Sequence, residues 1–479
     1  MIIKKSFIIF FIFFLFFQDI SISKGKEEIV NEIKKIFENK HLKHSEFSIR
    51  VLSKDKKEII ISLNESMKLI PASTIKILTT SAAIYKLGPS FLIRTRFLSD
   101  NPINNGKIKG NVYIKGYGNP LLTSNDLKSI AEYLYKLGLR TIEGNIILDD
   151  SYFENKLFRK DWIDEKENNE ENAISALSLN NNSFPVLIHS SSKINTKPEI
   201  TIINNISDVK VINNLKVKKV NKRKEKINIT LKEKNDEYLL SITGIMRPGR
   251  IKYYSISIKE PAIYLGKCFK TILQDIGISL KGKVVKGLLP TKYNEIYVHS
   301  IKIDSLIKVI NKHSNNFCAD HLLKILGAEL ISVPGTSKNG TNAIQLFLKE
   351  NRIDSSHYNI YDGSGLSKKN KLSTYCISQI LYNNTLNNNV FNVFSNSLSI
   401  AGIDGTLKHR MNELTNPQNV RGKSGTLSNA CTLAGYINTS ENELLIYAIF
   451  INNFKSNQYE IRKIQDKIVS LLSEFSRNN

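Results

Sequence analysis

Apolar residues recur with helical spacing near the N-terminus and alternate with polar residues between the helical stretches. Spacing of three or four positions predicts helices at 26–39 and in a run that starts at Ile75 and stops before Gly88. Alternation at 47–51 and 59–61, on either side of a polar turn, predicts a β-hairpin. The first 95 residues therefore predict a mixed α/β unit.

The pattern changes between residues 96 and 289. Short strand-like runs, separated by glycine turns, replace the long helical runs at 112–114, 146–148, 200–203 and 238–242. One helix is predicted at about 124–137, with Ser124 as its N-cap. We expect a strand-rich insertion of one or two lobes at 96–289, in which the lysine-rich part at about 195–245 is the more peripheral.

Helical spacing returns from about residue 300. It predicts helices at 307–310 and 319–326 with a break at 313–316, and further helices at 339–350, 373–383 and 457–475. Between the last two helices, apolar runs at 433–437 and 444–451 on either side of a polar turn predict two strands. We expect residues 24–95 and 290–479 to form the two parts of one α/β catalytic domain, with the insertion between them.

The N-terminus has the features of a secretory signal peptide, which we assign to residues 1–23. Lys4 and Lys5 precede the apolar run 7–17, and small residues follow at Ser21 and Ser23. An uncleaved membrane anchor is the alternative. In either case the protein is expected to be exported, to a periplasm or to the cell envelope.

The chain carries a net charge of +24 in 479 residues, with a dense basic patch at 216–226. For an exported protein the matching polyanions are cell-wall polymers or anionic lipid headgroups, and no nucleic acid is expected. A solvated strand edge protected by lysine is the simpler explanation of the patch. The four cysteines are scattered and form no Cys-x-x-Cys motif, so we expect buried free thiols and no metal or cofactor.

Ser73 and Lys76, in the segment 71–76 (PASTIK), are the first candidates for chemistry. Three positions apart on a helix, their side chains lie on one face. A serine hydroxyl needs a base within hydrogen-bond reach, and a lysine can serve once burial or positive charge lowers its pKa. The Ser-x-x-Lys spacing recurs elsewhere in the chain, so this motif alone is weak.

Two further motifs follow in order. Segment 314–316 (SNN) lies in the predicted break between helices, and segment 423–426 (KSGT) is expected just before a strand. His313 and His409 are poor candidates for a catalytic histidine, because lysine already supplies a base and no Gly-x-Ser-x-Gly elbow surrounds Ser73.

The ordered set resembles the penicillin-recognising serine hydrolases, whose motifs are Ser-x-x-Lys, Ser-x-Asn and Lys-Thr/Ser-Gly. Within them the chain is most similar to the D-alanyl-D-alanine carboxypeptidase/endopeptidase family of low-molecular-mass class C penicillin-binding proteins. That narrower likeness rests on the long gap between Ser73 and Ser314 and on the segments 116–120 (GYGNP), 175–180 (SALSLN), 361–367 (YDGSGLS), 401–407 (AGIDGTL) and 433–436 (LAGY). Tyr117 and Asn119 stand where the family has Gly and Asp.

This resemblance implies a transpeptidase-like α/β fold with a large insertion between the first and second motifs, and a serine-type hydrolase of peptidoglycan stem peptides that β-lactams inhibit. It implies catalytic roles for Ser73, Lys76, Ser314, Asn316 and Lys423, and substrate-binding roles for Ser424, Gly425 and Thr426. Carboxypeptidase and endopeptidase action are both compatible with the motifs. A β-lactamase and a catalytically silent cell-wall-binding protein are the alternatives.

Overall fold

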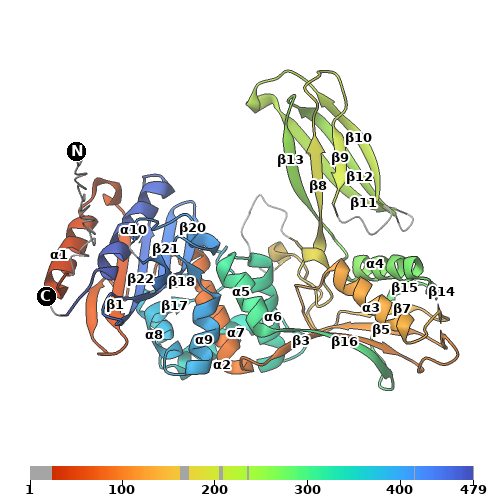
Figure 1. Ribbon diagram of the computed structural model, residues 1–479, viewed down its shortest axis with the longest axis horizontal. Helices are drawn as coiled ribbons and strands as arrows, with labels where there is room; N and C mark the ends of the chain where they lie inside the picture. Colours follow the sequence, from red (N-terminus) through yellow and green to blue (C-terminus); the bar gives the residue numbers. More distant parts are fainter. Residues whose placement is uncertain (1–23, 162–171, 204–208, 235–236, 415, 478–479) are drawn as a thin grey trace, which may run out of the picture.

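A six-stranded antiparallel sheet organises the end of the molecule where the described chain begins and ends, at Lys24 and Arg477 (Figure 1). The computed structural model describes residues 24–161, 172–203, 209–234, 237–414 and 416–477, so the predicted signal peptide lies outside the described residues. The strand order is β19-β20-β21-β22-β1-β2. The strands are β1 (Glu46–Ser53), β2 (Ile59–Leu63), β19 (Ser399–Ile400), β20 (Val420–Leu427), β21 (Ala430–Asn438) and β22 (Leu444–Asn452).

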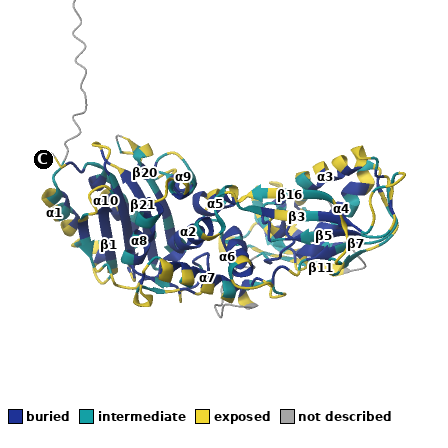
Figure 2. Cartoon of the chain, turned by 90° about the horizontal axis from the view of Figure 1, so that it is seen from below, coloured by how far each residue is buried: buried dark blue, intermediate teal, exposed yellow. Residues whose placement is uncertain are grey.

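Helices cover both faces of this sheet, which is why its central strands are apolar at nearly every position. In β22, Ile449 and Ile451 face a core shared with α1 (Lys26–Phe37) and α10 (Gln458–Ser473). Ala448 and Phe450 face the opposite core, which the other helices cover. Figure 2 shows these strands as buried ribbons between outer helices.

The second face is covered by helices that the apolar spacing largely predicts. They are α2 (Lys76–Leu87), α5 (Ile303–Lys312), α6 (Asn316–Leu330), α7 (Ser337–Glu350), α8 (Thr374–Asn384) and α9 (Asn388–Ser397), with the small hairpin β17 (Tyr358–Asn359) and β18 (Lys371–Leu372) beside them. Helix α9 was not predicted, because its asparagines and serines are poor helix formers. Buried Val390 and Phe394 hold it against the core.

A second sheet carries the rest of the chain. Its strand order is β15-β7-β5-β3-β16, and helices α3 (Ser124–Lys136) and α4 (Pro261–Ile276) pack on it. The strands are β3 (Leu92–Ser99), β5 (Val112–Gly116), β7 (Ile146–Asp149), β15 (Val284–Lys286) and β16 (Asn294–Lys302), and a smaller sheet joins β4 (Lys107–Ile108), β6 (Thr141–Ile142) and β14 (Ser279–Leu280). The predicted N-cap of α3 is wrong by one residue. Thr123 caps the helix in a reciprocal pair with Asp126, so Ser124 is already helical.

Residues 183–257 form a β-sandwich that projects from this second sheet (Figure 1). One layer is β8 (Ser183–His189), β9 (Glu199–Ile202) and β13 (Ile251–Ser257), and the other is β10 (Val209–Val217), β11 (Lys226–Lys234) and β12 (Glu237–Met246). We call this sandwich the finger.

No helix within the described ranges is long and apolar enough to cross a bilayer. All four cysteines are buried and free, which confirms that expectation.

Candidate active site

Ser73 lies on a tight turn that leads into a long buried helix. Residues Ala72–Ile75 form a 3₁₀ turn, and α2 begins at Lys76. Side chains three apart are eclipsed in a 3₁₀ turn, so the Lys76 ammonium group reaches the Ser73 hydroxyl, with 2.9 Å between Nζ and Oγ. Ala72, just before the serine, has φ of +45°, which is a strained conformation for alanine. The surrounding structure therefore holds the serine in a conformation that the isolated chain disfavours.

The Lys76 amine is fully buried and lies among oxygen atoms. It contacts Oδ1 of Asn316 at 2.7 Å and the carbonyl oxygen of Ser364, besides the serine hydroxyl. A neutral amine has two N–H groups and one lone pair. In the neutral form that a base requires, the amide and carbonyl oxygens would accept the two N–H groups, and the lone pair would face the proton of the Ser73 hydroxyl. This arrangement suits a base.

The second motif occupies the break between α5 and α6, as predicted. Ser314 has φ of +54°, and the side chain of Asn315 caps α6 by accepting from the N–H of Cys318. This geometry turns the Ser314 hydroxyl toward Lys423, with 2.9 Å between Oγ and Nζ. Asn316 is the first residue of α6 and points to Lys76.

The third motif lies within strand β20 and not before a strand, which corrects the prediction. Gly425 passes so close to the nucleophile that a Cβ there would lie 2.7 Å from the backbone nitrogen of Ser73. Lys423 is fully buried, and its amine also donates to the Ser424 carbonyl oxygen at 2.7 Å. Burial, and then the positive charge of Lys76, lower the pKa of Lys423 well below its usual range.

A pocket of about 350 Å³ opens in front of these groups. Ser73, Ser314, Ser424 and Thr426 line it, and Lys76, Asn316 and Lys423 lie behind that lining. Three further lining residues, Thr406, Arg410 and Arg462, were not predicted. Thr406 belongs to segment 401–407, which was noted for its likeness to the family but given no role, whereas no motif of the sequence marks Arg410 or Arg462. His313 and His409 are exposed and do not line the pocket.

A buried ionic cluster behind Lys76 was also missed. Arg159 contacts Asp320 at 2.9 Å, the Ser364 hydroxyl at 2.8 Å and the carboxylate of Asp362. Burial raises the pKa of Asp362, but Arg159 and the N–H groups of Gly365 and Ser367 lower it below its usual value overall. For Asp320, burial outweighs Arg159 and leaves the pKa raised. Through Ser364, the cluster holds the carbonyl that accepts from Lys76.

His321, which follows Asp320 in α6, connects this helix to segment 175–180. Its Nε2 lies 3.0 Å from the Ser178 hydroxyl and 3.1 Å from the Ser175 carbonyl oxygen. Complete burial lowers its pKa from 6.5 to about 4. The folded state therefore binds fewer protons than the unfolded state between these pH values. We expect the free energy of unfolding to fall on acidification through this window, by up to about 1.4 kcal/mol per pH unit from this group.

Urea unfolding at several pH values would measure this effect. The H321N variant should show a flatter pH dependence than the unchanged protein, whereas H409N, at an exposed histidine, should not. Equal slopes for H321N and the unchanged protein would show that this histidine is not the acid-sensitive group.

The fold and these contacts define a penicillin-binding-protein-like serine hydrolase. A sequence model of the D-Ala-D-Ala carboxypeptidase 3 (S13) family matches residues 29–475. The chain belongs to this family, and with it is a serine-type D-Ala-D-Ala carboxypeptidase.

Individual relatives agree with the family match. The chain is 26% identical over 430 residues to the D-alanyl-D-alanine carboxypeptidase DacB of Haemophilus influenzae, covering 88% of this chain and 87% of the relative. It is 25% identical over 463 residues to the D-alanyl-D-alanine carboxypeptidase of Actinomadura sp., covering 94% and 85%. The crystal structure of penicillin binding protein 4 (dacB) from Haemophilus influenzae superposes with a TM-score of 0.79 at 23% identity, covering 92% of this chain and 99% of that one. The predicted α/β fold class is thereby confirmed.

Proposed function

We propose that the protein hydrolyses the bond after the penultimate D-alanine of peptidoglycan stem peptides through an acyl-enzyme on Ser73. One observation carries the assignment of roles, namely the direct contact of the Lys76 amine with the Ser73 hydroxyl. Ser73 attacks the carbonyl carbon while its proton moves to Lys76. The buried oxygens around Lys76 support this role, because they orient its lone pair toward the serine.

The remaining groups serve the leaving amine and the developing oxyanion. The Ser314 hydroxyl, backed by Lys423, delivers a proton to the nitrogen as the C–N bond breaks. Backbone N–H groups of Ser73 and Thr426 stabilise the oxyanion, an effect worth about 3 kcal/mol per donor. The close approach of Gly425 to the Ser73 nitrogen supports this placement. Water then releases the acyl group and regenerates the Ser73 hydroxyl.

Mass analysis of purified muropeptides would test this function. We expect loss of one D-alanine from uncross-linked pentapeptides, or cleavage of the cross-link in dimers, and the products decide between carboxypeptidase and endopeptidase action. Penicillin should leave a persistent adduct on the peptide that contains Ser73. Rapid turnover of penicillin would indicate a β-lactamase. An unreactive Ser73 would indicate a silent wall-binding protein.

We also propose that the protein is exported and that its finger contacts an anionic membrane surface. The sequence of residues 1–23 supports export. Residues 183–257 contain fifteen Lys and Arg but six Asp and Glu. The finger's outer loops, 190–198, 218–225 and 247–250, are here called the basic tip. Their exposed basic residues are Lys193, Lys197, Lys218, Lys219, Lys222, Arg223, Lys224 and Arg250.

Apolar side chains among these charges favour a membrane over a soluble polymer. Ile194 is 54% exposed at the tip, and Ile251, which follows Arg250, is 67% exposed. The acidic residue of these loops, Glu225, is already paired with Arg247 and Lys252. A basic surface with exposed aliphatic residues suits the interface of an anionic bilayer, where each basic residue contributes about 1 kcal/mol.

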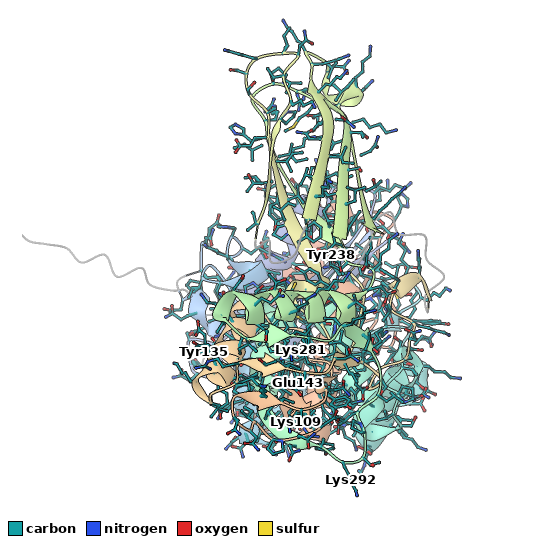
Figure 3. All side chains as sticks on the ribbon, turned by 90° about the vertical axis from the view of Figure 1, so that its right-hand side faces the viewer. Lys109, Tyr135, Glu143, Tyr238, Lys281 and Lys292 are labelled. Atoms are coloured by element: carbon teal, nitrogen blue, oxygen red, sulfur yellow. The ribbon has the colours of Figure 1, made fainter. Side chains whose placement is uncertain are left out.

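Sedimentation with lipid vesicles would test this contact. The protein should bind vesicles that contain phosphatidylglycerol and should lose this binding at high salt. It should not bind vesicles of pure phosphatidylcholine. The triple variant K222E/R223E/K224E should lose binding, whereas K281E/K283E/K292E should keep it, because Lys281 and Lys292 lie on the body below the finger (Figure 3). Binding to a soluble polyanion but not to vesicles would favour an anionic wall polymer and contradict the membrane proposal.

A further inference from the structure

The pocket in front of Ser73 contains two arginines, and only one of them is neutralised. Arg410 donates to Asp466 from both Nε and Nη2, at 2.9 and 2.7 Å. Its Nη2 also lies 3.3 Å from the carbonyl oxygen of Arg462. This ion pair leaves Arg410 little charge to offer a ligand and fixes it against α10.

Arg462 has no acidic partner among the residues that the structure describes. It is half-buried in the first part of α10 and lines the pocket. Its Nη2 donates to the hydroxyl of Thr426 at 3.1 Å. A hydroxyl that accepts from a guanidinium directs its own proton elsewhere, so Thr426 is left as a donor to a further acceptor. Guanidinium and hydroxyl together form a donor pair suited to a carboxylate.

The other cations near the serine do not fill this role. Lys423 is fully buried behind the pocket lining and is engaged with Ser314 and the Ser424 carbonyl oxygen. The Ser424 hydroxyl contacts Thr406, with 2.8 Å between the oxygens. Of the two arginines that line the pocket, Arg462 is therefore the one whose charge is not neutralised by a carboxylate. That charge is permanent, because a guanidinium does not lose its proton in proteins.

We propose that Arg462 is a specificity-determining residue that binds the α-carboxylate of the amino acid released from the substrate. The inference rests on the proposed function and narrows its substrates to peptides whose leaving residue has a free α-carboxylate. Terminal D-alanine satisfies this requirement. A cross-linking D-amino acid also satisfies it when its α-carboxyl group forms no further peptide bond. A C-terminal amide does not.

Paired substrates that differ only in this group would test the inference. The substrates are an acylated D-Ala-D-Ala peptide acid and its C-terminal amide, and the variants are R462Q and R462K. We expect R462Q to lower kcat/KM for the acid by about 10- to 100-fold, the loss of one charge-assisted hydrogen bond, and to leave the amide unchanged. R462K should recover part of the preference. K463Q removes a neighbouring exposed charge of α10 and should behave as the unchanged protein.

The outcomes separate this inference from the proposed function. If the unchanged protein neither acylates on Ser73 nor cleaves the acid, the proposed function fails. If it does both and R462Q keeps the acid-to-amide ratio, the inference about Arg462 is overturned and the function stands. If R462Q lowers kcat/KM equally for the acid and the amide, Arg462 acts by holding Thr426 or the fold. That result would also overturn the inference about Arg462.

Discussion

Replacement of Lys76 by methionine is expected to slow acylation of Ser73 by penicillin about 10²- to 10⁴-fold, the range for loss of a general base. Methionine keeps most of the buried volume but cannot accept the serine proton, and it leaves Asn316 and the Ser364 carbonyl without their donor. The rate of adduct formation, followed with a fluorescent penicillin, measures the effect.

Two further variants give this measurement its scale. S73A removes the nucleophile and defines the zero of labelling. K76R keeps a positive charge and several donors but cannot act as a base, because its guanidinium does not deprotonate. We expect K76R to be nearly as slow as K76M. Acylation of K76R at a rate close to that of the unchanged protein would disprove the role of Lys76 as base.

The R159M variant is expected to lose about 3–5 kcal/mol of unfolding free energy, the usual cost of leaving buried charge uncompensated. The Arg159 side chain is 8% exposed, and its partners Asp320 and Asp362 are 4% and 0% exposed. In this variant Asp362 still accepts from the N–H groups of Gly365 and Ser367. Most of the loss therefore comes from Asp320, whose carboxylate loses its arginine partner. Urea unfolding measures the loss. Acylation should also slow, by about 10-fold, because the Ser364 carbonyl is no longer held against Lys76.

The double variant R159M/D320N should recover part of this stability, because it removes the orphaned carboxylate. R247M, which breaks a partly exposed ion pair of the finger, should cost less than about 1 kcal/mol and serves as the matched control. A loss in R159M as small as that of R247M would show that the buried cluster is not a stabilising element.

Much of the outer architecture could be predicted from local pattern. Apolar spacing predicts α2, α6 and α10, alternation predicts β1, and a continuous apolar run predicts β22, because each of these elements packs in the core. Strand β20 (VRGKSGTL) was missed because it does not follow that rule. It carries polar residues toward the pocket and a glycine beside the nucleophile, so its composition reflects the site and not the core.

The three motifs could be predicted because each is short and local, whereas their partners are not. Arg159 meets Asp320 and Asp362 across 161 and 203 positions of the sequence. Arg462 reaches Thr426 from a helix 36 positions later. No local pattern distinguishes these arginines from the many basic residues of the chain. Only tertiary packing selects them.

Strand β1, near the N-terminus, pairs along its whole length with β22, near the C-terminus. Lys24 likewise bonds to the backbone of Glu474 and Ser476. The β1–β2 hairpin must therefore wait for β20, β21 and β22 before the sheet can close, and a chain that ends before Leu444 lacks both the strand next to β1 and the helix that brings Arg462 to the pocket. Conversely, because Lys24 and Ser476 are hydrogen-bonded neighbours, a short linker between these two residues allows a circular permutant with new ends opened in an exposed loop.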